Sequence, residues 1–330
     1  MDPTRRPSPR RLSGATSPKP ELRSRPIDEH AADHRRHAPA NAEYKFTAIG
    51  TRWRIATELP LPEELRQRVA SLTEDFDHVW SRFRADSLIT QVAQAAEGGR
   101  FGFPGRDEPL MNLYDRLVTA TAGAIDPLVG RDLELLGYDA HYTLVPDEAA
   151  IGGRRHRHSW GTDTHRDGAT VTTDGPVVID VGAAGKGHLI DLIAHLLLNG
   201  DIDEFMVDGS GDIRHRGPNP VIVGLEHPTV PGRAIGTVPV RDEALCASTT
   251  TRRAWGDGLH HILDGRTGRP VTDVVATWAI AGDAATADGL ATALFVSEPA
   301  ALSEFDFRWV RMLTDGRVQW SDDFDGKLFL

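Results

Sequence analysis

The chain has 330 residues and 40% of them are hydrophobic, which is enough to bury the core of one large domain or of two ordinary ones. The net charge of −11 excludes nucleic acid as the partner of the body of the protein. A single cysteine, Cys246, excludes an internal disulfide and a cysteine-based metal site, and no apolar run reaches the roughly 18 residues that a membrane helix needs.

The first forty residues differ from the rest of the chain in composition. They carry seven prolines and nine basic residues against five acidic ones, a net charge of about +4. Such a segment cannot bury enough apolar surface to order itself. Two arginine pairs, Arg5–Arg6 and Arg10–Arg11, resemble a twin-arginine signal, but no apolar segment follows them. We therefore expect a disordered, Arg- and Pro-rich tail over residues 1–43 and a single folded domain over residues 44–330.

The folded part is expected to begin with a strand and two helices. Alternating apolar residues over 46–56 predict the strand, and Pro60 and Pro62 mark a turn after it. Apolar residues spaced three or four apart from Glu63 onward predict a helix. Ser87 is a suitable N-cap, so a second helix is expected to follow it.

The next segments are expected to be a loop over residues 98–109, a helix over residues 110–121 and an irregular polar stretch over residues 152–168. The polar stretch contains three histidines, at positions His156, His158 and His165. Histidines grouped in this way can bind a metal ion. A solvated loop is the more common reason for such a stretch, and it is the interpretation we favour.

The stretch from Val177 to Leu198 organises the chain. Apolar, mostly β-branched residues over 177–181 predict a buried strand, and a small-residue turn holding Lys186 follows. Apolar residues at helical spacing then predict a helix, which Asn199-Gly200 can end. A strand, a glycine turn and a helix N-terminus together form a common anion site. Two interpretations stay open at this point: a phosphate site and a tight structural turn.

The C-terminal half is expected to consist mainly of strands. Apolar runs predict strands over 204–208, 221–225, 236–240 and 274–281, and a helix over 284–296. Asp288 and Thr292 are four residues apart in that helix and therefore share a face. Their oxygens suit Mg²⁺, which prefers hard donors and completes its shell with phosphate and water. The alternative is that Asp288 interacts with the helix dipole while Thr292 packs.

Two further residues are candidates for chemistry. His261 precedes an apolar pair and Asp264, and it can be an acid–base group, a phosphate contact or a structural histidine. Ser248 lies in a run of small residues over 246–251, where its hydroxyl can bind a ligand or belong to a turn. No GxSxG motif surrounds Ser248, which argues against a serine hydrolase.

Seven segments in sequence order resemble the ApbE family of FAD:protein FMN transferases, known in older naming as thiamine biosynthesis lipoproteins. The resemblance runs from about Ala48 to Val296. The segments, with the family motifs they are similar to, are Ile49–Trp53 (GTxW), Trp80–Ser87 (FSxY…S), Gly123–Pro127 (GxFDP), Asp180–Asp191 (DLGxxAKGxxxD), Asp208–Asp212 (NxGGD), His261–Pro270 (HIIDPRTGxP) and Ala287–Val296 (ADALATALFV). Seven motifs in the right order are hard to obtain by chance.

The resemblance implies an α+β fold with mixed sheets and packed helices, arranged in two parts with the ligand in a cleft between them. It implies FAD as the substrate, Mg²⁺ as the cofactor and a second protein as the acceptor. The family moves FMN from FAD onto a Ser or Thr hydroxyl, forms a phosphoester and releases AMP. No signal peptide or lipoprotein cysteine is seen, so we expect a cytoplasmic member without a membrane span.

Site residues are carried over by position. The resemblance implies that Asp288, Thr292 and the backbone carbonyl of Ala183 hold the metal. It implies that Lys186, Ser248 and His261 line the FAD site, with Asp264 near it. His261 is our choice for taking the proton of the acceptor hydroxyl, and Asp288 is the alternative.

Two other functions use the same pocket. The chain differs from the family motifs at several positions, including Gly185, Ser210 and Gly265, so one alternative is a protein that binds FAD without transferring FMN. The other is an FAD pyrophosphatase, in which water replaces the acceptor hydroxyl and FMN and AMP are both released.

Overall fold

The protein is described by a computed structural model that covers residues 25–26, 42–153 and 156–329. Most of the tail predicted over residues 1–43 therefore lies outside the described residues. Within that stretch, Arg25–Pro26 form strand β1 and pair with Ala234 and Arg233, and strand β2 begins at Ala42.

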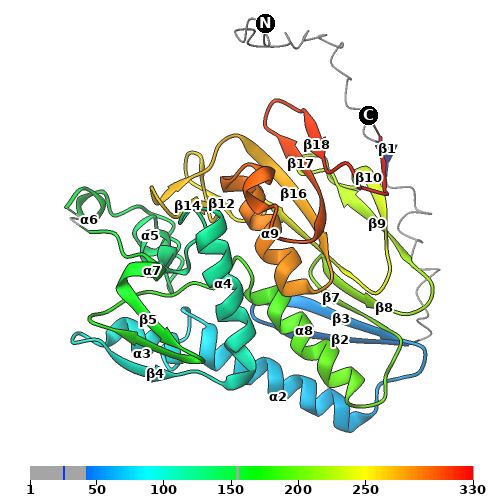
Figure 1. Ribbon diagram of the computed structural model, residues 1–330, viewed down its shortest axis with the longest axis horizontal. Coiled ribbons are helices and arrows are strands. Elements are labelled where there is room, and N and C mark those ends of the chain that lie inside the picture. The colour runs from blue at the N-terminus through cyan, green and yellow to red at the C-terminus, as the bar shows by residue number, and fades with distance from the viewer. Residues whose placement is uncertain (1–24, 27–41, 154–155, 330) are drawn as a thin grey trace, which may run out of the picture.

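An eight-stranded sheet runs through the molecule, and each of its ladders is antiparallel over the described residues (Figure 1). Its strands in spatial order are β18 (Val318–Trp320), β17 (Phe307–Leu313), β16 (Val274–Ala281), β11 (Ala244–Thr249), β8 (Asp212–Arg216), β7 (Phe205–Gly209), β3 (Thr51–Thr57) and β2 (Ala42–Ala48).

The two faces of this sheet are buried in two different hydrophobic cores. Along β16, Ala279 and Ala281 belong to a core shared with helices, whereas Trp278 and Ile280 belong to a core shared with a second sheet. This alternation follows from the two-residue period of a strand, which sends successive side chains to opposite faces. The sheet is therefore the middle of three layers.

Helices form the layer on one face (Figure 1). They are α2 (Glu63–Trp80), α4 (Glu108–Ala120), α8 (Gly185–Leu198) and α9 (Ala284–Val296). The layer on the other face is a smaller sheet, composed of β1 (Arg25–Pro26), β9 (Val221–Glu226), β10 (Arg233–Val240) and β19 (Lys327–Leu328).

Shorter elements gather beside the helical layer (Figure 1). A three-stranded sheet contains β4 (Gly99–Gly102), β6 (Thr170–Thr173) and β5 (Thr164–Asp167). The short helices are α3 (Leu88–Gln94), α5 (Gly130–Leu135), α6 (Glu148–Gly153), α7 (Trp160–Asp163) and the 3-10 turns η2 (Gly105–Asp107), η3 (Pro127–Val129) and η4 (Pro299–Leu302). Two small hairpins pair β12 (Ala254–Trp255) with β13 (Leu259–His260), and β14 (Leu263–Asp264) with β15 (Arg269–Pro270).

The α+β class is confirmed, and several predicted elements match the structure. The helix predicted over 284–296 is α9, and the helix of the central stretch is α8, which ends with Asn199 as its C-cap. Ser87 caps α3 by accepting a hydrogen bond from the Thr90 N–H. No helix in the described part of the chain is both long and apolar enough to cross a membrane.

Two predicted strands are corrected. Residues 46–56 form a hairpin rather than one strand, because Ile49 (φ 44°) and Gly50 (φ 72°) adopt left-handed conformations that reverse the chain between β2 and β3. The predicted strand over 177–181 is not part of any sheet among the described residues, although Val177, Ile179 and Val181 are buried. Its apolar side chains pack into the helical core, which gives them burial without a ladder.

Two predicted irregular regions contain regular structure. The loop expected over 98–109 contains β4 and the start of α4, and the polar stretch over 152–168 contains α7 and β5. In both regions the strands are short and half exposed. They lack the apolar alternation that signals a strand in the sequence.

Candidate active site

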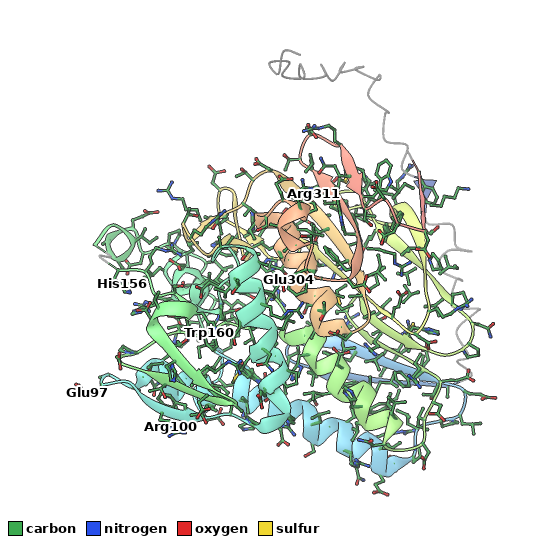
Figure 2. The ribbon with its side chains drawn as sticks, viewed as in Figure 1. Glu97, Arg100, His156, Trp160, Glu304 and Arg311 are labelled. Atoms are coloured by element: carbon green, nitrogen blue, oxygen red, sulfur yellow. The ribbon has the colours of Figure 1, made fainter. Side chains whose placement is uncertain are left out.

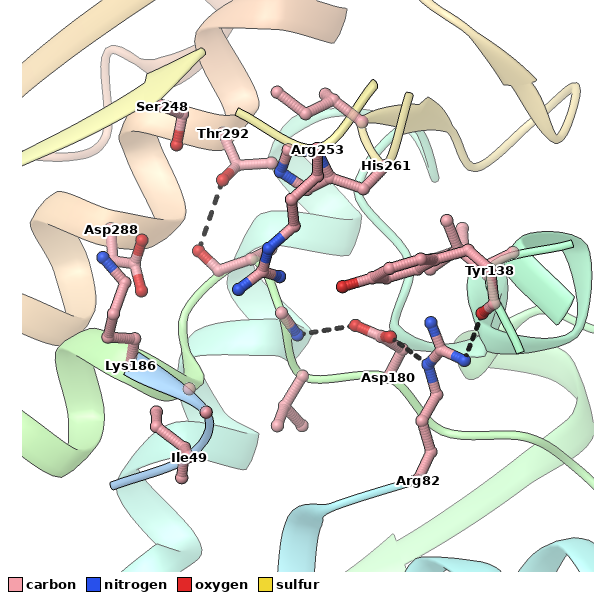
Figure 3. A pocket seen from close by; sticks show the side chains of 18 of the residues that line it. Ile49, Arg82, Tyr138, Asp180, Lys186, Ser248, Arg253, His261, Asp288 and Thr292 are labelled. Carbon is pink, nitrogen blue, oxygen red and sulfur yellow. Dashed lines mark hydrogen bonds and ion pairs between the residues drawn. The ribbon is translucent and has the colours of Figure 1, made fainter. Parts of the chain in front are cut away.

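A cavity of about 1070 Å³ opens beside the N-terminus of α8, between α9, the end of β11 and the aromatic residues that precede α6 (Figure 3). Segments far apart in the sequence line it. They include Ile49–Thr51, Ser81–Arg84, Asp180–Ala183, Ala247–Thr249 and His261–Leu263. Two chemically different ends can be distinguished: a charged end near α8 and α9, and an aromatic end.

Three ionisable side chains are grouped at the charged end, and two of them, Lys186 and Asp288, line the cavity. Lys186, in the first turn of α8, makes an ion pair with Asp212 at the start of β8. The second oxygen of Asp212 accepts a hydrogen bond from the Ala247 N–H at 3.0 Å. Asp288 of α9 accepts one from the Gly187 N–H at 2.9 Å. Two buried carboxyl groups thus share one lysine.

Because two carboxyl groups share one lysine, the pKa values of this cluster are shifted. Burial and the neighbouring Asp212 raise the pKa of Asp288 well above its usual value, against the opposing effect of Lys186. Burial lowers the pKa of Lys186, but Asp212 and Asp288 outweigh it and the pKa is raised. The lysine therefore stays charged, and the cluster favours additional positive charge, either a proton or a cation.

Asp288 is accompanied by two more oxygens that face the cavity. Thr292 lies one turn further along α9, and its Oγ1 is 3.4 Å from the carbonyl oxygen of Ala183, in the turn that precedes α8 (Figure 3). A carboxylate, a hydroxyl and a carbonyl are hard oxygen donors of the kind that Mg²⁺ prefers. Burial and Asp212 disfavour the ionised form of Asp288, and Lys186 does not fully offset them. A cation beside Asp288 would therefore stabilise its carboxylate, which supports the fit of such an ion.

The turn that carries Ala183 is held in place by the ion pair between Arg82 and Asp180. Arg82 donates from Nε to Asp180 at 2.6 Å and from Nη1 to the Tyr138 carbonyl at 2.6 Å. The other oxygen of Asp180 accepts from the Gly182 N–H at 2.7 Å. Burial raises the pKa of Asp180, but Arg82 outweighs it, and the pKa is lowered. Asp180 is therefore an ionised anchor for the turn.

The aromatic end consists of four rings that line the cavity. Tyr138 stacks on Trp255 with centroids 5.5 Å apart, and Phe83 stacks on Tyr142 at 5.2 Å. Phe83 and Tyr138 meet edge to face at 5.5 Å, which joins the two pairs. Such a wall suits a planar ring, because stacked aromatic contacts add to the burial of apolar area.

His261 and Ser248 lie on the wall opposite α8 (Figure 3). Nδ1 of His261 is buried and has no hydrogen-bond partner among the described residues. Burial, reinforced by Arg253, lowers the pKa of His261 to about 4. His261 is therefore neutral near pH 7. Ser248 pairs with Thr277 across β11 and β16, which holds it at the rim of the charged end.

The structure brings six of the predicted site residues to this cavity, namely Ala183, Lys186, Ser248, His261, Asp288 and Thr292. Asp264 is not among them. Its carboxylate instead accepts hydrogen bonds from the Arg266 backbone N–H at 2.9 Å and the Arg266 guanidinium at 2.6 Å. Leu263 of the same short strand lines the cavity, whereas the carboxylate of Asp264 is held by Arg266.

Several residues at or beside the cavity are not among the site residues predicted from the sequence. Asp180 and Asp212 lie within motif segments, where a buried acid next to glycines is a signal. Arg82 lies within the Trp80–Ser87 segment. Tyr138 and Arg253 lie outside all seven segments, and no local pattern indicates them because their role depends on contacts between distant segments.

Comparison with known proteins gives the following matches. The sequence model of the ApbE family matches residues 49–306. An FAD:protein FMN transferase of Vibrio cholerae is 30% identical over 244 residues, which are 70% of this chain and 73% of that protein. One of Haemophilus influenzae is 30% identical over 256 residues, 71% of this chain and 72% of that protein. The solved structure of flavin transferase ApbE from Vibrio cholerae has a TM-score of 0.76 at 26% identity, and the match covers 86% of this chain and 97% of that one.

Proposed function

This chain belongs to the ApbE family, and we propose that it is a Mg²⁺-dependent FAD:protein FMN transferase. In the proposed reaction a Ser or Thr hydroxyl oxygen of an acceptor protein attacks the phosphorus of the FMN half of FAD. The bond from that phosphorus to the AMP oxygen breaks, and AMP leaves with the bonding electrons. The products are a phosphoester-linked FMN on the acceptor, free AMP and the hydroxyl proton.

The observation that carries the proposal is one cavity with a charged end and an aromatic end. FAD carries a diphosphate with a flat ring system on either side of it, so the diphosphate would bind at the charged end and one of the two rings at the aromatic end. The volume of about 1070 Å³ lies just above the usual range of small-molecule pockets, about 300–1,000 Å³, which suits a ligand as large as a dinucleotide.

At the charged end, Asp288, Thr292 and the Ala183 carbonyl would hold the Mg²⁺ ion. When bound, the ion supplies positive charge that offsets the negative charge of the diphosphate and of the departing AMP. Lys186 and the positive end of the α8 helix dipole would attract the phosphate oxygens. They are in place before the substrate arrives, so they need little reorganisation during the reaction.

His261 is the proposed acceptor of the hydroxyl proton. Its low pKa keeps the imidazole unprotonated near pH 7, and Nδ1 has no partner among the described residues. Asp288 is the weaker choice, because its Oδ2 already accepts the Gly187 N–H and its carboxylate would bind the metal. Ser248, at the rim, would contact the diphosphate or the incoming acceptor.

The proposal is tested with purified protein, FAD and Mg²⁺, in the presence and absence of a protein fragment that carries a Ser or Thr acceptor site. AMP is quantified, and covalent flavin is measured as fluorescence that stays on the acceptor after denaturation. Acceptor-dependent AMP together with fluorescent acceptor supports the transferase. FMN and AMP without acceptor identify a pyrophosphatase, and retained FAD without AMP identifies a binding protein.

The domain over 44–330 and the cytoplasmic location stay predictions.

A further inference from the structure

A second group of polar side chains lies outside the cavity, next to helix α7. His156 Nε2 is 2.8 Å and His158 Nδ1 is 2.9 Å from the same oxygen, Oδ1 of Asp163. The two imidazole rings are perpendicular, with centroids 4.9 Å apart, and the three ligand atoms lie within 4.8 Å of one another. None of these residues lines the cavity. Figure 2 shows His156 at the outer edge of the molecule.

The carboxylate is oriented by other contacts. Oδ2 of Asp163 accepts hydrogen bonds from the Ser159 N–H at 2.9 Å and the Thr162 hydroxyl at 2.7 Å. These contacts turn Oδ1 toward the histidines. Burial raises the pKa of Asp163, but the Ser159 N–H and the two imidazoles outweigh it, and the pKa lies well below its usual range. Metal-binding carboxylates are commonly oriented by hydrogen bonds of this kind.

We propose that His156, His158 and Asp163 form a binding site for a divalent transition-metal ion such as Zn²⁺. Two imidazole nitrogens and one carboxylate oxygen form a donor set that favours Zn²⁺ over Mg²⁺. With metal–ligand distances of about 2.0–2.2 Å, tetrahedral ligand atoms lie about 3.3 Å apart, so both imidazoles have to shift from their present distances of 2.8 and 2.9 Å to Oδ1 of Asp163. Each imidazole would then carry its proton on the ring nitrogen that faces away from the metal.

The exposure of the three side chains permits this movement and the entry of an ion. The exposed fractions are 63% for His156, 36% for His158 and 18% for Asp163. The histidines can rotate toward solvent, while the more buried aspartate stays fixed. A water molecule can complete the coordination from the open side.

The bound ion would stabilise the wall of the cavity. Between the two histidines, Arg157 donates to both oxygens of Asp132, at 3.0 and 2.9 Å, and to the Gly265 carbonyl at 2.7 Å. The Trp160 N–H donates to Asp126, which lines the cavity, at 3.0 Å. The ion would link the two ends of the segment 156–163, which contains Arg157 and Trp160. The role of the site is therefore structural, and it is separate from the proposed Mg²⁺ site.

The test is Zn²⁺ binding by the full chain, measured by titration calorimetry with Mg²⁺ in excess and without FAD. The variants His156→Ala and His158→Ala are compared with His165→Ala, which removes an exposed histidine of β5 outside the cluster. The chain has 14 histidines, so the site is measured as the difference between these variants.

Wild type and His165→Ala are expected to bind one more equivalent of Zn²⁺ than His156→Ala, or to bind Zn²⁺ more than about tenfold more tightly. The reason is that loss of even an indirect partner of a metal lowers its affinity by about 10–100-fold. Zn²⁺ should raise the Tm of wild type and His165→Ala only. Circular dichroism in EDTA checks folding, and His158→Ala is the second variant if His156→Ala does not fold. Equal Zn²⁺ binding by all variants overturns the site. Neither result depends on FMN transfer.

Discussion

Asp288 is the residue at which the charge balance of the cavity is decided. It is 4% exposed, shares Lys186 with Asp212, and its pKa is raised by burial and by Asp212. A raised pKa means that the folded protein favours the protonated carboxyl. The free energy of unfolding therefore falls as the pH rises above the unfolded value of about 3.9, unless a cation compensates the charge.

Asp288→Asn is accordingly expected to slow FMN transfer strongly without unfolding the protein. The amide keeps an oxygen for the Gly187 N–H but removes the charge that would bind Mg²⁺. Loss of several kcal/mol of transition-state stabilisation lowers the rate on the order of 10³-fold. The measurements are AMP release and Tm with and without Mg²⁺. Mg²⁺ should raise the Tm of wild type only, and a fully active variant would contradict the metal assignment.

His261 gives a prediction of pH dependence. Its pKa of about 4 is below the unfolded value of about 6.5, so the stability linked to it is complete above pH 6.5 and is lost as the pH falls toward 4. Because the imidazole remains neutral, single-turnover transfer should not lose activity through His261 until the pH approaches 4.

His261→Gln tests the same assignment by substitution. It is expected to lower the rate of transfer by about 10²–10⁴-fold, the usual contribution of a general base, with FAD affinity much less affected. FAD binding is followed by flavin fluorescence and transfer by rapid quench. Transfer at the wild-type rate would remove His261 from the mechanism and favour Asp288 as the base.

At the scale of elements, the site depends on how closely α8 approaches α9. A Cβ on Gly187 would lie 2.1 Å from the Ala284 carbonyl oxygen, so only glycine permits this approach. The approach places Lys186 and Asp288 on neighbouring helices at the charged end (Figure 3). The Gly187 N–H also donates to Asp288.

Gly187→Ala is expected to separate the two helices and to destabilise the protein by about 1–3 kcal/mol or more, the usual cost of overpacking. Gly161→Ala is the matched control, because it adds a Cβ in a helix where nothing lies within 4 Å. Urea unfolding of both variants gives the comparison. Equal stabilities would show that α8 and α9 can move apart freely.

At the scale of the whole molecule, the two ends of the cavity are assembled by the three-layer core. Residues that line it begin at Ile49, and β1 adds only a two-residue pairing at the edge of the smaller sheet. Deletion of residues 1–41 is therefore expected to leave FMN transfer unchanged within the error of the assay. The AMP assay and a thermal melt check this. A folded but inactive truncation would instead place part of the function in the tail.

The sequence alone determined features that depend on local order. Helical spacing and capping predicted α8, α9 and α3, and seven ordered motifs predicted the family and six residues that line the cavity. These signals are local because a helix face, a cap or a glycine turn is formed by residues close together in the chain.

Tertiary structure decided what depends on distant segments. It turned residues 46–56 into a hairpin, buried 177–181 without a ladder, and directed Asp264 toward Arg266 and away from the cavity. It also brought Arg82 to Asp180 and Tyr138 to Trp255, pairs that are far apart in sequence. The physical reason is that burial and electrostatic pairing are properties of the packed core, which no local pattern of residues contains.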